Sequence, residues 1–287
     1  MSAGNDAPAA AIRLRVFGRL DLEVDGGDAD RVLAQPRRLA LLLYLVLRRP
    51  GGFVGRDHLL GLFWPESPAS QARASLRQAL RFLRRCLGSA RLPGRGGEVS
   101  VELAGLTCDA LEFRRALADG DPEAALSVYE GDLLPGFFMP DAPDAQRWLE
   151  TERSYLRTEA RRAALELSEA EMAAADLNEA ARHARRALEL EPTHEPSARQ
   201  LIRVLDAMGN RAGAMAVYEE LLHTLDETLQ LEPSAATKDL LERVRRDRGS
   251  ATAVGDTEGD VERSSAPTRV VVGSFENLTG DAGLDVL

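Results

Sequence analysis

The sequence predicts a mainly α-helical protein with a small β component, in which a winged helix-turn-helix is followed by an α-helical tetratricopeptide-like domain. Two observations predict this fold class. Strand-like alternation stands before and after three helical segments within residues 12–107. Beyond them, an all-helical pattern continues to about residue 248 and carries an internal repeat of 34 residues, the tetratricopeptide period.

The first elements are two short strands. Apolar residues alternate with charged ones over 12–16, and again over 20–24, just before the turn residues Asp25, Gly26 and Gly27. A period of two places every second side chain on the same face of a strand. The two segments therefore predict a small, half-buried sheet.

Three helices and a further strand follow. Pro36 is favoured at a first helical position, and the helix it opens is apolar nearly all round, which predicts a central buried helix. The third helix carries Leu76, Leu80, Leu83 and Leu87 on one face. The expected elements are helices over 36–49, 55–63 and 68–87, a loop over 64–68, and an alternating strand over 98–103.

The charge of the chain is unevenly distributed. The 287 residues carry a net charge of −10. Residues 1–107 hold 16 arginines and 10 acidic residues, a balance of +6, whereas residues 108–287 hold 20 basic and 36 acidic residues, a balance of −16. This asymmetry suggests that the first part meets a polyanion.

The composition also narrows the class of protein. No apolar run approaches the roughly 20 residues needed to span a bilayer, and the first residues lack the pattern of a signal peptide. The cysteines, Cys86 and Cys108, have no metal-like spacing, and the four histidines are scattered. We therefore expect a cytoplasmic protein that is not an enzyme and has no catalytic residues, no metal, no cofactor and no membrane contact.

The repeat defines the architecture of the second half. Residues 175–176 align with 209–210, and the small or apolar positions that follow them align at the same distance of 34 residues. Gly120 and Asp121 begin an earlier, diverged copy. The domains predicted from these patterns are a DNA-binding winged helix-turn-helix at 12–107, a helical domain at 108–248, a linker at 249–268 and the start of a truncated domain at 269–287.

The strongest functional signal is the polar face of the helix over 68–87. Between Glu66 and Glu98 there are seven arginines and no acidic residue. Arginine offers a planar fork for guanine edges and phosphates, and glutamine can pair with adenine. The predicted DNA-binding residues are Arg73, Arg77, Gln78 and Arg81 at or near the bases, Arg84 and Arg85 on phosphates, Arg91 and Arg95 on the turn of the wing, and Gln71 on the same polar face of the helix.

Two other interpretations remain open at this point. The basic face could be a solvated face, or it could pack against an acidic partner or against the acidic half of the chain itself, which would make the protein a tetratricopeptide-type interaction adaptor. Alternatively, the chain could be the regulatory front part of a larger signalling protein or enzyme. A steep salt dependence of binding separates a DNA reader from an adaptor.

Several segments resemble one family of bacterial regulators. The segments are 31–45 (RVLAQPRRLALLLYL), 62–66 (LFWPE), 74–80 (ASLRQAL), 83–88 (LRRCLG), 109–113 (DALEF), 129–136 (YEGDLLPG), 148–150 (WLE) and 152–153 (ER). They resemble the SARP-type activators, the antibiotic regulatory protein family, in which a winged helix precedes a bacterial transcriptional activation domain. The resemblance covers residues 12–246, although the glycine-rich wing is shorter than the commonest form.

The resemblance implies a function and partners. These activators bind repeated sites in promoter DNA and recruit the RNA polymerase holoenzyme, partly through the loop before the recognition helix. In this chain that loop contributes Trp64, Glu66 and Ser67, although Trp64 could equally close the core between two helices. A homodimer on DNA is left open. Residues 269–287 resemble the start of a TolB-like domain.

Overall fold

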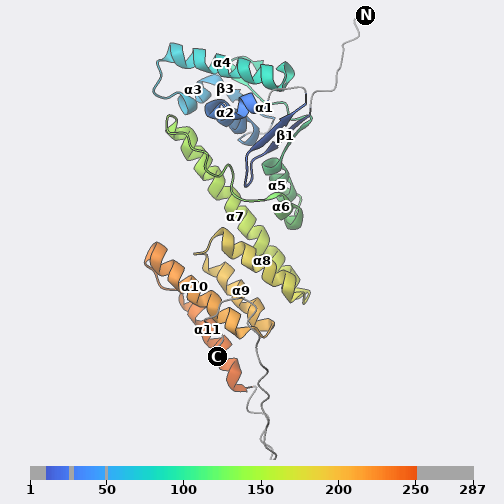
Figure 1. The fold of residues 1–287 in the computed structure, drawn as a ribbon, viewed down its shortest axis with the longest axis vertical. Helices are drawn as coiled ribbons and strands as arrows, with labels where there is room; N and C mark the ends of the chain where they lie inside the picture. Colours follow the sequence, from blue (N-terminus) through green and yellow to red (C-terminus); the bar gives the residue numbers. More distant parts are fainter. Residues whose placement is uncertain (1–10, 26–28, 49–50, 251–287) are drawn as a thin grey trace, which may run out of the picture. The chain divides into compact units, whose positions relative to one another are not determined.

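The computed structural model describes residues 11–25, 29–48 and 51–250, and it is mainly helical as the sequence predicts. Figure 1 shows the order of its elements along the chain. The predicted linker over 249–268 lies almost entirely outside the described residues, and the predicted TolB-like segment at 269–287 lies wholly outside them. Among the described residues, no helix is both long and apolar enough to cross a membrane.

The first sheet joins the two ends of the winged-helix region. Strand β1 pairs antiparallel with β2, and it pairs in parallel with β6, which comes more than 90 residues later. Ile12 and Leu14 are buried while Arg13 between them is exposed, as the alternation predicts. The strands are β1 (Ile12–Arg15), β2 (Asp21–Val24) and β6 (Leu106–Cys108).

Four helices form the body of the winged-helix region. Every residue of α2 from Leu39 to Leu47 is buried, which confirms the expectation of a central helix. The short helix α1 has no counterpart among the predicted elements. The helices are α1 (Ala29–Leu33), α2 (Pro36–Leu47), α3 (Arg56–Phe63) and α4 (Ala69–Leu87).

The wing is a small second sheet in the order β3-β5-β4, with antiparallel pairs. The last of its strands along the chain, β5, begins at Glu98 as predicted but is shorter than the predicted 98–103. The chain leaves the ladder after Val99, because the amides of Ser100 and Glu102 donate to the carbonyls of Pro93 and Arg91 instead. The elements are β3 (Val54–Gly55), η1 (Ser89–Arg91), β4 (Gly94–Arg95) and β5 (Glu98–Val99).

The second half is a succession of helices with a recurring turn. Gly120, Ala175 and Gly209 all have positive φ angles, of 75°, 66° and 75°. The next residue in each case caps a helix with its side chain, which accepts the amide three residues on. The helices are α5 (Asp109–Ala118), α6 (Pro122–Val128), α7 (Pro143–Ala173), α8 (Leu177–Leu190), α9 (Glu195–Ala207), α10 (Arg211–Leu229) and α11 (Ala235–Ser250).

The winged-helix region and the first helices beyond it share one hydrophobic core, which extends from Ile12 to Ala160. Phe17, at the end of β1, packs against Phe113 and Tyr129, with ring centroids 5.6 and 4.6 Å away. The carboxylate of Asp109 accepts the amides of Val16 and Phe17 at 2.8–3.0 Å. Burial raises the pKa of this carboxyl group above its ordinary value.

A second contact joins the two regions beside α7. Tyr44 of α2 packs against Trp148 of α7 in an edge-on arrangement, with ring centroids 4.8 Å apart. Its hydroxyl group lies 2.7 Å from Nε2 of His58 in α3. The guanidinium of Arg114 in α5 donates to the carbonyl of Leu47 at 2.6 Å. Helix α7 therefore packs against and stabilises the winged-helix region that carries the predicted DNA-binding surface.

Candidate nucleic-acid interface

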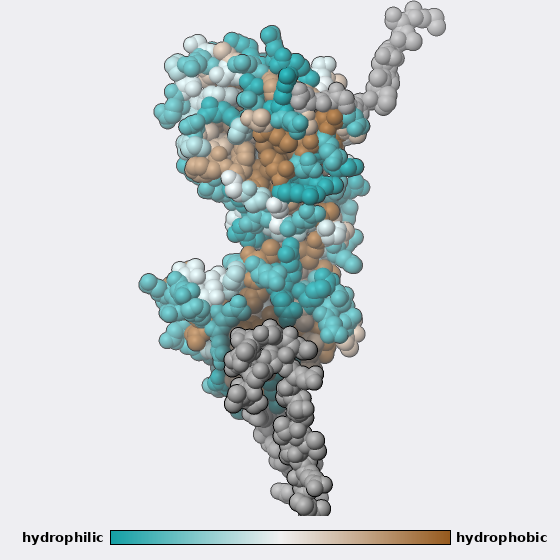
Figure 2. Space-filling view, viewed as in Figure 1, coloured by the Kyte–Doolittle hydropathy of each residue, from teal (hydrophilic) through white to brown (hydrophobic). Residues whose placement is uncertain are grey.

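Helix α4 buries one face and exposes the other. Leu76, Leu80, Leu83 and Leu87 are at most 3% exposed, so the predicted leucine stripe belongs to the core. The remaining face is hydrophilic, and hydrophilic colour covers α4 in Figure 2. A helix that is apolar on one side and basic on the other keeps its charged side chains available for a partner.

The exposed face carries the predicted residues. Gln71, Arg73, Arg77, Gln78 and Arg81 are all exposed. Among the residues that the structure describes, Arg73, Arg77 and Arg81 have neither an ion pair nor a hydrogen bond with another side chain. No described carboxylate of the acidic half thus neutralises these three arginines.

Two hollows lie on opposite flanks of α4, and Gln78 and Arg81 line both of them. These two side chains therefore form the crest of the helix. The hollow beside α1 and α2 has a volume of about 530 Å³ and adds Arg31, Arg38 and Arg85. The hollow beside α3 has a volume of about 440 Å³ and adds Arg56, Arg77 and Arg84.

Three of these arginines were not among the predicted site residues: Arg31, Arg38 and Arg56. They come from α1, from the first turn of α2 and from the start of α3. Each lies far from α4 in the sequence, and only the packing of the helices brings it beside the basic face. The net excess of arginine over acidic residues in residues 1–107 was the sequence signal that could have pointed to them.

Arg84 and Arg85 differ although they are neighbours. Arg84 donates from Nε and Nη2 to the carbonyl of Leu92, at 2.9 and 2.8 Å. It therefore ties the end of α4 to the base of the wing. Arg85 is exposed, and its Cζ lies 5.8 Å from the ring centroid of Phe82. Because Nε and Nη2 of Arg84 donate to Leu92, only the remaining N–H groups of its guanidinium are available for the predicted phosphate contact.

The two arginines predicted for the wing also differ. Arg95 is exposed, lies 4.1 Å from the ring centroid of Phe53 and is 3.8 Å from the carboxylate of Glu98. Arg91 is only 2% exposed and donates to the carbonyl of Ala104. The expectation that Arg91 reaches DNA is therefore wrong, because its side chain closes the core under the wing.

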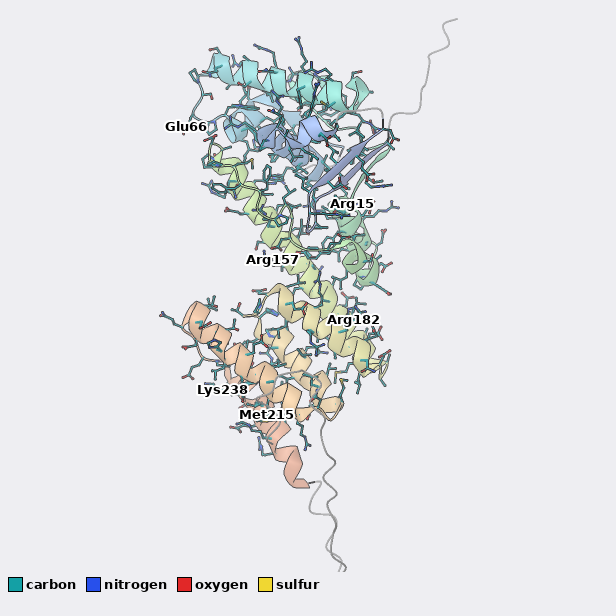
Figure 3. The ribbon with its side chains drawn as sticks, viewed as in Figure 1. Arg15, Glu66, Arg157, Arg182, Met215 and Lys238 are labelled. Atoms are coloured by element: carbon teal, nitrogen blue, oxygen red, sulfur yellow. The ribbon has the colours of Figure 1, made fainter. Side chains whose placement is uncertain are left out.

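The loop before α4 has one buried and one exposed part. Trp64 is 8% exposed and packs against Phe63, as the packing alternative predicts. The guanidinium of Arg37 lies 6.0 Å from the Trp64 ring and 3.4 Å from the carboxylate of Asp141, just before α7. Glu66 is exposed and Ser67 half-buried. Figure 3 shows Glu66 in this loop, where α3 gives way to α4.

No metal centre competes with this assignment in the described part of the chain, which contains no cluster of histidine, cysteine and carboxylate side chains that could hold a metal ion. Both cysteines are buried, and neither forms a disulfide. Burial raises the pKa of the Cys108 thiol to about 12, so it remains protonated.

A winged helix whose exposed face carries arginines, followed by tetratricopeptide-like helices, is an arrangement typical of DNA-binding transcriptional regulators. Comparison with known proteins agrees with this class. Residues 108–245 match the family described as the bacterial transcriptional activator domain. These matches support a regulator similar to the SARP-type transcriptional activators.

Two curated relatives and one solved structure resemble the chain. The regulatory protein AfsR of Streptomyces griseus is 28% identical over 84% of this chain, which spans only 25% of that protein. The transcriptional regulatory protein EmbR of Mycobacterium bovis is 25% identical over 98% of this chain and 77% of its own length.

The solved structure is that of Mycobacterium tuberculosis EmbR in complex with a low-affinity phosphopeptide. It has a TM-score of 0.59 and 24% identity, and the match covers 83% of this chain and 66% of that one. At this identity the likeness concerns the fold.

Proposed function

We propose that the chain is a sequence-specific activator of transcription, which places the crest of α4 in the major groove of promoter repeats. The observation that carries the proposal is the exposed crest of Gln78 and Arg81, which lies between two arginine-lined hollows. The major groove of B-DNA admits one α-helix, and phosphates border it on both sides.

The chemistry of the crest fits base recognition. Arg81 can donate two hydrogen bonds to O6 and N7 of guanine, and Gln78 can pair with N6 and N7 of adenine. Arg77, Arg73 and Gln71 lie exposed on the same helix and extend this surface toward its start. Arg85 and Arg95 are exposed at the other end of α4 and on the wing, where they can neutralise phosphates.

The test is selection of binding sites from a pool of random duplexes, followed by affinity measurements on the selected site. We expect the wild-type chain to enrich a repeated motif, and the double variant Arg77→Ala/Arg81→Ala to bind the selected site at least about 30-fold more weakly. That figure follows from about 1 kcal/mol or more for each arginine that contacts a base.

A matched control removes two other exposed arginines. Arg115→Ala/Arg147→Ala changes the charge equally, in the helical half, where the side chains are 85% and 74% exposed. We expect this control to enrich the wild-type motif. Enrichment of the same motif by the double variant of α4 would overturn the proposal.

We further propose that the exposed part of the loop, Glu66 with Ser67, contacts RNA polymerase holoenzyme, while Trp64 supports the loop from beneath. Support comes from exposure, because Glu66 projects from the loop whereas Trp64 is buried. In transcription from a promoter that bears the selected motif, Glu66→Ala should lower activation and leave DNA affinity unchanged. Full activation by that variant would exclude this contact.

The proposed organisation has a DNA-reading region at 12–107 and a helical region at 108–248. Promoter repeats would bring two copies of the chain together on DNA. The mass of the complex on a two-site duplex, measured by light scattering, tests this part. One copy bound at saturation would contradict it.

A further inference from the structure

We propose that the hollow between α4 and the junction of α1 with α2 is a seat for a backbone phosphate of the bound DNA, with Arg38 and Arg31 as its ligands outside the recognition helix. This inference rests on the proposed function and adds to it a site that the predicted residues did not include. Arg85 and Arg81 of α4 complete the lining of the hollow.

The sign of the charge points to an anion. Four arginines line this hollow and no carboxylate does. A hollow between α6 and α8 offers a comparison, since it also has three arginines but places Glu123 and Glu189 among them. Carboxylates stand among the arginines of that comparison hollow, whereas none lines the hollow beside α1 and α2, which favours an anionic ligand there.

Phe82 orients the arginines that line the seat. The Cζ atom of Arg38 lies 4.1 Å from the ring centroid of Phe82, and that of Arg85 lies 5.8 Å from it. Phe82 is itself 8% exposed and fixed by the core. Guanidinium groups held against an aromatic ring lose less freedom when they bind a phosphate, and their planar fork matches its oxygens.

The start of α2 adds a weaker positive potential to the hollow. Gln35 precedes the first residue of this 12-residue helix and lines the hollow. The unpaired amides at a helix start carry partial positive charge, which favours an anion nearby. The arginines remain the main ligands, since they carry full charges.

The position of the hollow favours DNA over a small phosphate compound. Gln78 and Arg81 belong to both the hollow and the crest that would enter the major groove. A phosphate in the hollow would then lie at the edge of the groove that the crest occupies. The hollow beside α3, on the opposite flank of α4, neighbours β4 of the wing, where Arg56 and Arg84 approach Gly94. The two flanks of α4 thus match the two phosphate rows that border the groove.

The adjacent residue Arg37 provides a matched control. Arg37 and Arg38 lie in the same first turn of α2, but the Arg37 guanidinium lies beside Trp64 and Asp141 rather than in the hollow. The substitutions Arg37→Gln and Arg38→Gln remove the same charge one residue apart. Only the second removes a ligand of the proposed seat.

The experiment measures the affinity of the full chain for a generic 30-base-pair duplex over a range of salt concentrations. It needs no known binding site, because phosphate contacts are independent of sequence. We expect Arg38→Gln to weaken binding several-fold and to reduce the slope of log K against log salt by about 0.9, the value for one lost phosphate contact. Arg37→Gln should keep the wild-type slope, and Arg38→Lys should restore it.

The outcomes separate the inference from the proposed function. No salt-dependent binding by the wild type would overturn the proposed function, and the seat with it. Binding by the wild type with an unchanged slope in Arg38→Gln would overturn the seat alone. Saturable binding of inorganic phosphate without DNA, lost in Arg38→Gln, would assign the hollow to a free phosphate compound instead. If Arg38→Gln does not fold, Arg31→Gln on the exposed helix α1 carries the same prediction.

Discussion

Helices α4 and α7 are both rich in arginine, yet they use it in opposite ways. On α7, Arg153 donates to the carbonyls of Leu133, Leu134 and Phe137, and Arg157 binds the carboxylate of Asp132. Figure 3 marks Arg157 on α7. On α4, within the described part of the chain, Arg77 and Arg81 pair with no carboxylate and donate to no carbonyl.

This contrast between α4 and α7 shows that the groups around an arginine decide its role. An arginine that already satisfies a carboxylate or a row of carbonyls holds the fold together, and the Arg157 hydrogen bond lowers the pKa of Asp132 below its ordinary value. An exposed arginine with no acidic neighbour costs self-repulsion until a polyanion binds. The local balance of charge, rather than arginine content, therefore distinguishes a binding helix from a structural one.

The largest expected effect tests whether the two regions fold as one unit. Phe113 is fully buried between Phe17 and Tyr129. Phe113→Ala should lower the free energy of unfolding by about 3–5 kcal/mol. In urea unfolding, circular dichroism and the fluorescence of the two tryptophans should change in one transition. Phe138→Ala, at an exposed phenylalanine, should change the stability by no more than about 0.5 kcal/mol. Two separated transitions in the wild type would contradict a shared core.

A smaller effect tests the contrast between the two helices directly. Arg153→Ala removes the guanidinium that donates to three carbonyl groups and should cost about 1–3 kcal/mol of stability. Arg77→Ala should change stability by no more than about 0.5 kcal/mol while it weakens DNA binding. Thermal unfolding of both variants provides the measurement. Equal losses of stability would show that Arg77 has a structural role as well.

The smallest effect concerns pH and is confined to the helical half. Burial and the nearby Arg161 hold the pKa of His194 below its ordinary value of 6.5, against the opposing effect of Glu191. The folded chain then binds a proton less readily than the unfolded chain. This contribution to stability is present above pH 6.5 and is lost as the pH falls through the lowered pKa.

The melting temperature measured between pH 7.5 and 5 checks this prediction. His194→Asn keeps a side chain that can accept the amide of Ser197 and should flatten the pH dependence. A variant that depends on pH as steeply as the wild type would assign the effect to other groups.

Local patterns were enough to predict most elements and the exposed crest. The leucine stripe of α4, the strands β1 and β2 and the capped turns of the repeat all follow from neighbouring residues. The short helix α1, the burial of Arg91 and the place of Arg38 did not follow. Each of these depends on which distant segments pack together, and a periodicity along one segment carries no information about that.

The carboxylate of Asp109 sets a limit on how such regulators can be recombined. It is the second residue of the matched helical family, yet it holds the amides at the end of the first strand. A chimaera cut at residue 107 would make those amides depend on an acceptor from the other relative, and it would divide a core that reaches Ala160. Exchange of the helical half between relatives should therefore succeed when the crossover lies within α7, beyond Ala160, rather than at the apparent domain boundary.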